Sequence, residues 1–141
     1  MSTPPPRRLS ILVVDDHADW TLVIEQLLRR QGHDVSVASG FAEALSVAAA
    51  MTRIDVLVSD ITLPDGNGRD LLPLLRERAG GGVTNAIALT GHSEEQWVRR
   101  CREAGFDTVL VKPVNFADLL AAVGPAAHVL PRQAFPIPAP S

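Results

Sequence analysis

The chain has 141 residues and a formal net charge of −3, with 46% hydrophobic and 21% charged residues. This length predicts a single domain, and the composition supplies a buried core and excludes global disorder. No basic patch points to nucleic acid, no apolar run reaches the length of a membrane span, and the first residues contain no signal peptide. Cys101 is the one cysteine, which excludes an internal disulfide and suits a reducing compartment. We therefore expect a cytoplasmic protein that binds neither nucleic acid nor membrane.

The predicted elements lie between a proline-rich, basic lead-in of residues 1–8 and a proline-rich tail of residues 124–141, so the domain is expected to span residues 9–123. Short apolar runs, bounded by polar or turn-forming residues, predict strands. They are Leu9–Val14, Asp34–Ala38, Ile54–Ser59, Asn85–Thr90 and Thr108–Val111. Helical spacing predicts helices over residues 18–31, from Ser39-Gly40 to about Met51, over 68–78, from Ser93 to Gly105, and from a cap at Asn115 to about Val123.

One proline conflicts with the third of these helices. The ring of Pro73 would clash with the preceding turn unless it lay in the first turn of the helix. We therefore expect this helix to start late, near Asp70. The following Gly80-Gly81-Gly82 is predicted to form a flexible loop.

Strands that alternate with helices in this way predict a parallel sheet with helices on both faces, joined by right-handed crossovers. The fold class is thus α/β and doubly wound. Its flavodoxin-like type, a five-stranded parallel sheet in the order 2-1-3-4-5 with five helices, is the architecture that we expect. Periodicity alone does not give this strand order.

Four of the five predicted strands end in residues with chemistry to offer. Asp15 and Asp16 follow the first strand, Asp60 the third, and Lys112 the fifth, while Thr90 ends the fourth. An aspartate at one strand end is by itself more often a turn former, but these ends share one edge of a parallel sheet. Three crowded carboxylates call for a hard divalent cation, above all Mg²⁺. The lysine and the hydroxyl suit an anionic phosphoryl oxygen.

The same stretches resemble the motifs of a known family. Val13–Asp16, Ser59–Gly66, Ala88–Gly91 and Val111–Pro113 resemble, as an ordered set, the motifs of the response-regulator receiver domain of two-component signalling. The resemblance covers about residues 9–123. The stretch Arg102–Asp107 is similar to the receivers of hybrid histidine kinases.

The resemblance implies a phosphoacceptor and a metal site. Asp60 matches the aspartate that takes a phosphoryl group from the phosphohistidine of a histidine kinase or histidine phosphotransfer protein. Asp16 and Asp60 would bind Mg²⁺, with Asp15 acting partly through water and the backbone carbonyl of Thr62 as a further ligand. Such a domain is not an enzyme beyond accepting the phosphoryl group and slowly losing it.

The resemblance also assigns residues around the acceptor. Thr90 and Lys112 match the switch hydroxyl and the lysine that bind the phosphoryl group, and the bond before Pro113 is often cis in such domains. Thr62 and His92 occupy the positions that tune how fast the phosphoryl group is lost.

The chain departs from the family pattern at several positions. Val109 stands where the last strand usually carries an aromatic residue, and Trp20 lies early in the first helix. We expect Trp97 to be partly exposed on the face of the fourth and fifth helices, as an anchor for a partner or for a dimer. His17 and His92 are expected in exposed loops, without companions at metal-ligand spacing.

Two other function classes stay open. The chain could be an interaction module with a receiver fold that is never phosphorylated, although its acceptor, lysine and threonine are all present. It could instead be a flavodoxin or a phosphatase, but the acidic Asp15-Asp16-His17 does not suit a phosphate loop, and Thr62 stands where the phosphatases carry a second aspartate. Because the residues outside 9–123 are too few for an output domain, we expect a single-domain regulator or the receiver of a hybrid kinase.

Overall fold

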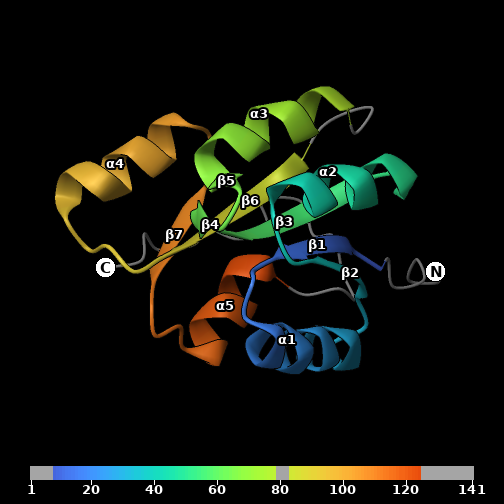
Figure 1. Ribbon diagram of the computed structural model, residues 1–141. Helices are drawn as coiled ribbons and strands as arrows, with labels where there is room; N and C mark the ends of the chain where they lie inside the picture. The colour runs from blue at the N-terminus through green and yellow to red at the C-terminus, as the bar shows by residue number, and fades with distance from the viewer. Residues whose placement is uncertain (1–7, 79–82, 125–141) are drawn as a thin grey trace, which may run out of the picture.

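A five-stranded parallel sheet lies between two layers of helices in the computed structural model, which describes residues 8–78 and 83–124 (Figure 1). Residues 1–7, the predicted glycine loop and residues 125–141 lie outside the described residues. All four strand pairings in the sheet are parallel. The order is β2-β1-β3-β6-β7, which confirms the predicted 2-1-3-4-5 when these five strands are numbered alone. The strands are β1 (Ser10–Val14), β2 (Asp34–Ala38), β3 (Ile54–Asp60), β6 (Val83–Thr90) and β7 (Thr108–Val111).

Each face of the sheet carries its own hydrophobic core. Helices α1 (Ala18–Arg30) and α5 (Phe116–Val123) cover one face, and α2 (Phe41–Ala50), α3 (Gly68–Arg78) and α4 (Glu95–Glu103) cover the other (Figure 1). Along β1, Ile11 and Val13 belong to the first core, while Leu12 and Val14 belong to the second. A strand buried on both faces needs apolar residues at every position, which explains the unbroken apolar runs in the sequence. None of the helices in the described ranges is long and apolar enough to cross a membrane.

The start of α3 differs from the prediction. The helix begins at Gly68 rather than near Asp70, and Pro73 therefore lies inside it. Two bonds fix this early start: the Gly68 amide donates to the carbonyl of Ile61 at 2.8 Å, and the Asn67 side chain accepts from the amide of Arg69 at 2.8 Å. A side-chain cap of this kind satisfies a free amide of the first turn. The local turn chemistry thus overrides the conformational cost of an internal proline.

A short antiparallel hairpin, β4 (Thr62–Leu63) and β5 (Gly66–Asn67), follows β3 and is not among the elements that the sequence predicted. Asp65 at its tip accepts hydrogen bonds from the amides of Phe41, at 2.7 Å, and Ala42, at 3.0 Å. The hairpin therefore caps α2. The bonds from Ala42 and Phe41 hold the pKa of Asp65 below its ordinary value of 3.8.

Gly68 provides a test of how tightly α3 is joined to the end of β3. A Cβ at this position would overlap the carbonyl oxygen of Asp60 and lie 3.0 Å from the Cα of Ile61. Because both neighbours are backbone atoms, we predict that Gly68→Ala lowers the free energy of unfolding by about 1–3 kcal/mol. Gly91→Ala is the control, since a Cβ there meets no heavy atom within 4 Å. Denaturant unfolding should separate the two variants, and equal stabilities would contradict the prediction.

Candidate functional site

The carboxylates predicted to converge do so at one edge of the sheet. The register pairs Val14 with Ser59, so that Asp15 and Asp60 follow from neighbouring strands. Asp15 and Asp60 are buried, at 2% and 4% exposure, whereas Asp16 is exposed. One ligand atom from each of these three residues and one from His17 lie within 4.8 Å of one another. Oxygen donors at this spacing fit a hard divalent cation such as Mg²⁺.

Lys112 bridges two of the carboxylates. Its Nζ lies 2.9 Å from Oδ2 of Asp60 and 3.5 Å from Oδ2 of Asp15. Burial lowers the pKa of Lys112, but the hydrogen bond to Asp60 and the negative charges of Asp15 and Asp60 outweigh it, so the pKa is raised above 10.5. Lys112 is therefore an ammonium ion at neutral pH. The backbone holds it there, because its amide donates to the carbonyl of Thr90 at 2.7 Å, and the Lys112–Pro113 peptide bond is cis.

The other oxygens of the two buried aspartates are bonded locally. Oδ1 of Asp60 accepts from the amide of Thr62 at 3.1 Å. Oδ1 of Asp15 accepts from the amide of His17 at 2.9 Å, and Nδ1 of the same histidine lies at 2.9 Å. These bonds aim both carboxylates into the cluster. The Thr62 side chain is exposed, and its carbonyl as a metal ligand stays a prediction.

Thr90 is buried at the end of β6, with its hydroxyl turned to α4. Its Oγ1 accepts from the amide of His92 at 3.0 Å and from the indole Nε1 of Trp97 at 2.7 Å. Within residues 8–78 and 83–124, no hydrogen bond joins Thr90 to Asp60. The sequence placed Trp97 partly at the surface, and it is half-buried. Its contact with Thr90, however, was not foreseen.

His17 corrects an expectation. The side chain is exposed, as predicted, but it has companions: Nδ1 lies 2.9 Å from Oδ1 of Asp15 and 3.4 Å from Oδ1 of Asp16. The hydrogen bond to Asp15 and the charges of Asp15 and Asp16 raise the pKa of His17 above 6.5. The sequence does contain a signal for this contact, because His17 directly follows Asp15-Asp16. A histidine in that position can fold its ring back onto the two preceding carboxylates. His92 is also exposed, and its ring lies 4.3 Å from that of Trp97.

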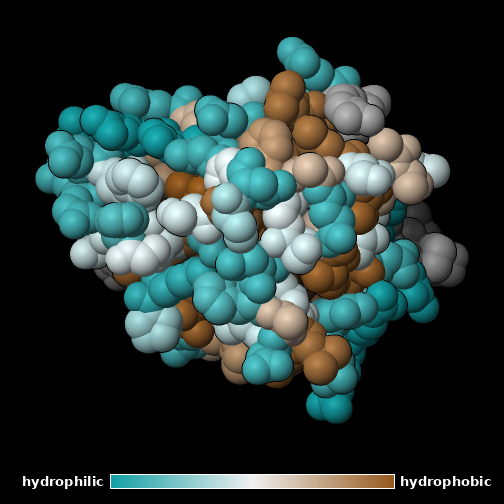
Figure 2. Space-filling view, in the orientation of Figure 1, coloured by the Kyte–Doolittle hydropathy of each residue, from teal (hydrophilic) through white to brown (hydrophobic). Residues whose placement is uncertain are grey.

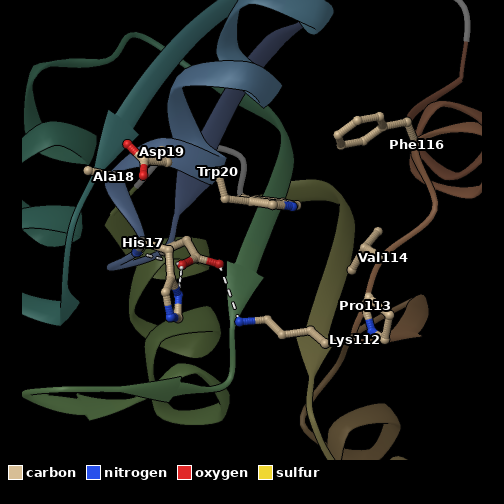
Figure 3. A pocket seen from close by; sticks show the side chains of 9 residues that line it. His17, Ala18, Asp19, Trp20, Lys112, Pro113, Val114 and Phe116 are labelled. Atoms are coloured by element: carbon tan, nitrogen blue, oxygen red, sulfur yellow. Dashed lines mark hydrogen bonds and ion pairs between the residues drawn. The ribbon is translucent and has the colours of Figure 1, made fainter.

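A cavity of about 620 Å³ opens beside Asp15 and Lys112. Figure 3 shows Trp20 of α1 facing Val114 and Phe116 from the segment that follows β7. The cavity thus joins a polar side at the charged cluster to an apolar side. Phe116 is 43% exposed, and two further apolar residues of α1, Leu22 and Val23, are exposed as well.

The fold and this sheet edge define the receiver class of signalling domain. The family model of the response regulator receiver domain matches residues 11–124, and the chain belongs to this family. Two-component signal transduction is therefore the process in which it takes part.

The relatives include chains of very different size. The sensory/regulatory protein RpfC of Xanthomonas campestris is 34% identical over 116 residues, which are 81% of this chain but 16% of RpfC. An uncharacterized 14.6 kDa protein of Leptolyngbya boryana is also 34% identical, over 82% of this chain and 88% of its own length. The chain therefore spans about a sixth of one curated relative and most of another.

Solved structures agree with the fold. A CheY-like receiver domain protein of Methanospirillum hungatei is 30% identical, with a TM-score of 0.71, over 81% of this chain and 89% of that chain. A response regulator of Burkholderia pseudomallei, solved with a phosphorylated aspartic acid, calcium ion and citrate, is 27% identical, with a TM-score of 0.73, over 82% of this chain and 66% of that chain.

The raised pKa of His17 can be tested by titrating its ring in the metal-free protein by NMR. We predict a pKa above 6.5 that falls toward 6.5 in Asp15→Asn, because that variant removes the main source of the shift. Asp19→Asn, which removes a charge from the same helix start, should leave it unchanged. Any stability linked to this raised pKa is complete below pH 6.5 and is lost as the pH rises through the folded value. An unshifted histidine in the wild type would contradict the geometry.

Proposed function

We propose that the protein is a phosphoacceptor receiver, in which Asp60 takes a phosphoryl group from a histidine kinase or histidine phosphotransfer protein, with Mg²⁺ as cofactor. The observation that carries the proposal is the contact of Lys112 with Asp60, beside two further aspartates. A nucleophilic carboxylate, a fixed cation and a carboxylate metal site are the parts that phosphoryl transfer needs.

The chemistry follows from the placement of these groups. An oxygen of Asp60 forms a bond to phosphorus as the bond from phosphorus to the imidazole nitrogen of the donor breaks, and that nitrogen leaves with the electron pair. Bound Mg²⁺ would neutralise charge on the phosphoryl oxygens. The Lys112 ammonium then pairs with a phosphoryl oxygen in place of the carboxylate. The Thr90 hydroxyl, released from α4, supplies a hydrogen bond to another.

The donor set suits the cofactor. Asp15, Asp16 and Asp60 offer carboxylate oxygens, the ligands that Mg²⁺ prefers, and the exposure of Asp16 leaves an entry path from solvent. The carbonyl of Thr62 is proposed as a further ligand. Thr62 and His92 are proposed to tune the lifetime of the aspartyl phosphate, because they flank the acceptor and the switch threonine along the chain.

The cavity beside the site offers a surface for the phosphodonor. Trp20 and Phe116 present apolar area next to Lys112. A donor protein docked here would bring its phosphohistidine toward Asp60. The outer surface of α4 is instead dominated by hydrophilic side chains (Figure 2). The part of a dimer interface that α4 would supply is therefore mainly polar.

The relatives support both settings of such a receiver. RpfC is a large sensory/regulatory protein, whereas the Leptolyngbya protein is about as short as this chain. We propose accordingly a single-domain regulator or the receiver of a hybrid kinase. The phosphorylated aspartate named for the Burkholderia regulator supports phosphorylation over a purely structural interaction module.

The acceptor assignment predicts the fate of one substitution. With Mg²⁺ and a small acyl phosphate, the wild type should gain the mass of one phosphoryl group, and Asp60→Asn should label at least about a hundredfold more slowly. Asp118→Asn, which changes an exposed carboxylate of α5, should label normally. Mass spectrometry with and without EDTA measures both effects. Full labelling of Asp60→Asn would show that another group is the acceptor.

Metal binding can be followed through Trp20, which lines the cavity beside Asp15. In a Trp97→Phe background, Mg²⁺ should change the fluorescence of Trp20 and raise the melting temperature. Asp16→Asn should weaken this response by about tenfold or more, whereas Asp19→Asn, with the same change of charge on the next turn, should retain it. Equal weakening in both variants would indicate a diffuse electrostatic effect rather than a metal site.

A further inference from the structure

Trp97 is held at the switch threonine by three contacts. Its indole Nε1 donates to Oγ1 of Thr90 at 2.7 Å, its ring centroid lies 4.3 Å from that of His92, and the Arg69 guanidinium carbon lies 5.2 Å from the ring. The ring also packs on the same core cluster as Val109. A tryptophan that is both half-buried and hydrogen-bonded has a fixed orientation. This position therefore does more than present an aromatic surface.

The contact determines where the Thr90 hydroxyl points. A hydroxyl has two acceptor lone pairs and one donor hydrogen. Both lone pairs are engaged on the α4 side, by the amide of His92 and the indole of Trp97. Rotation of the side chain that brings Oγ1 toward Asp60 carries it away from the indole. The bond to Trp97 thus belongs to the state in which Thr90 does not contact the acceptor.

We propose that Trp97 is a positioning residue for the phosphoryl site, whose indole N–H holds Thr90 away from Asp60 and must release it when the phosphoryl group binds. The inference rests on the proposed function. A contact made in one state alone opposes the transition to the other, so Trp97 lowers the affinity for the phosphoryl group. Release also frees the indole from Thr90, so that Trp97 can move relative to the His92 ring that it contacts. The state of Asp60 is thereby transmitted to the first turns of α4.

Trp97→Phe tests this role because it keeps an aromatic ring and removes the N–H. With Mg²⁺ present, the variant should bind beryllofluoride, a phosphoryl mimic, roughly three- to tenfold more tightly than the wild type, the effect of one neutral hydrogen bond. In a Thr90→Val background, where there is no hydroxyl to hold, the same substitution should have no effect. NMR titration of backbone amides gives all four affinities.

A spectroscopic measurement on the wild type is independent of how well the variants fold. The indole N–H resonance of Trp97, assigned by its loss in Trp97→Phe, should exchange slowly with solvent in the free protein and faster once Mg²⁺ and beryllofluoride are bound. An equally protected indole in both states, or equal affinities of wild type and Trp97→Phe, would overturn the positioning role while leaving the phosphoacceptor function intact. An affinity gain that persists in Thr90→Val would also overturn it. A wild type that does not bind beryllofluoride would overturn the proposed function and this inference with it.

Discussion

The contact between Lys112 and the two buried aspartates is the interaction on which the site depends. Asp15 and Asp60 are almost fully withdrawn from solvent, and burying an uncompensated carboxylate costs several kcal/mol. One ammonium group at 2.9 and 3.5 Å offsets this cost for the pair in part, but with Asp16 beside them the cluster stays net negative. The residual charge suits a divalent cation. The uncompensated negative charge that destabilises the fold is thus also what would attract a cation to this site.

Main-chain hydrogen bonds of the surrounding strands hold the charged residues in position. Asp15 donates its amide to Ala38 of β2, and Lys112 donates its amide to Thr90 of β6, so each functional residue is tied to a neighbouring strand. Gly68 lets α3 approach the carbonyl of Asp60 more closely than any residue with a Cβ would. Both of these tethers are main-chain hydrogen bonds, so they do not depend on which side chains lie at the surface.

Sequence patterns predicted the five strands of the sheet, the five helices and the aspartates and lysine that meet, because parallel strands bring their carboxyl ends to one edge of the sheet. They did not predict contacts between residues that lie far apart in the sequence and meet only in the folded chain. The capping of α2 by Asp65 spans more than twenty residues, so no local capping signal marks it. The start of α3 was misjudged because the cost of Pro73 was weighed without the bonds made at Gly68. The sequence spacing predicts no metal-ligand companions for His17, whereas the structure places its ring against Asp15 and Asp16, the two residues just before it.

Val109 and Trp97, which lie on the proposed signalling path, also show how far the sequence alone can predict contacts. A valine has one stiff side-chain torsion and cannot rotate a large surface into or out of the core, so the sequence could exclude an aromatic switch on β7. It could not reveal what takes that role, because nothing in the spacing of α4 shows that an indole reaches back to Thr90. In the structure both residues pack on one core cluster, and the large, polar-tipped ring sits on the helix rather than on the strand. In the proposed mechanism, a change at Thr90 first displaces Trp97 and thus α4. The same helix is anchored to this cluster by the buried Cys101. The large side chain beside Thr90 thus comes from α4 rather than from β7.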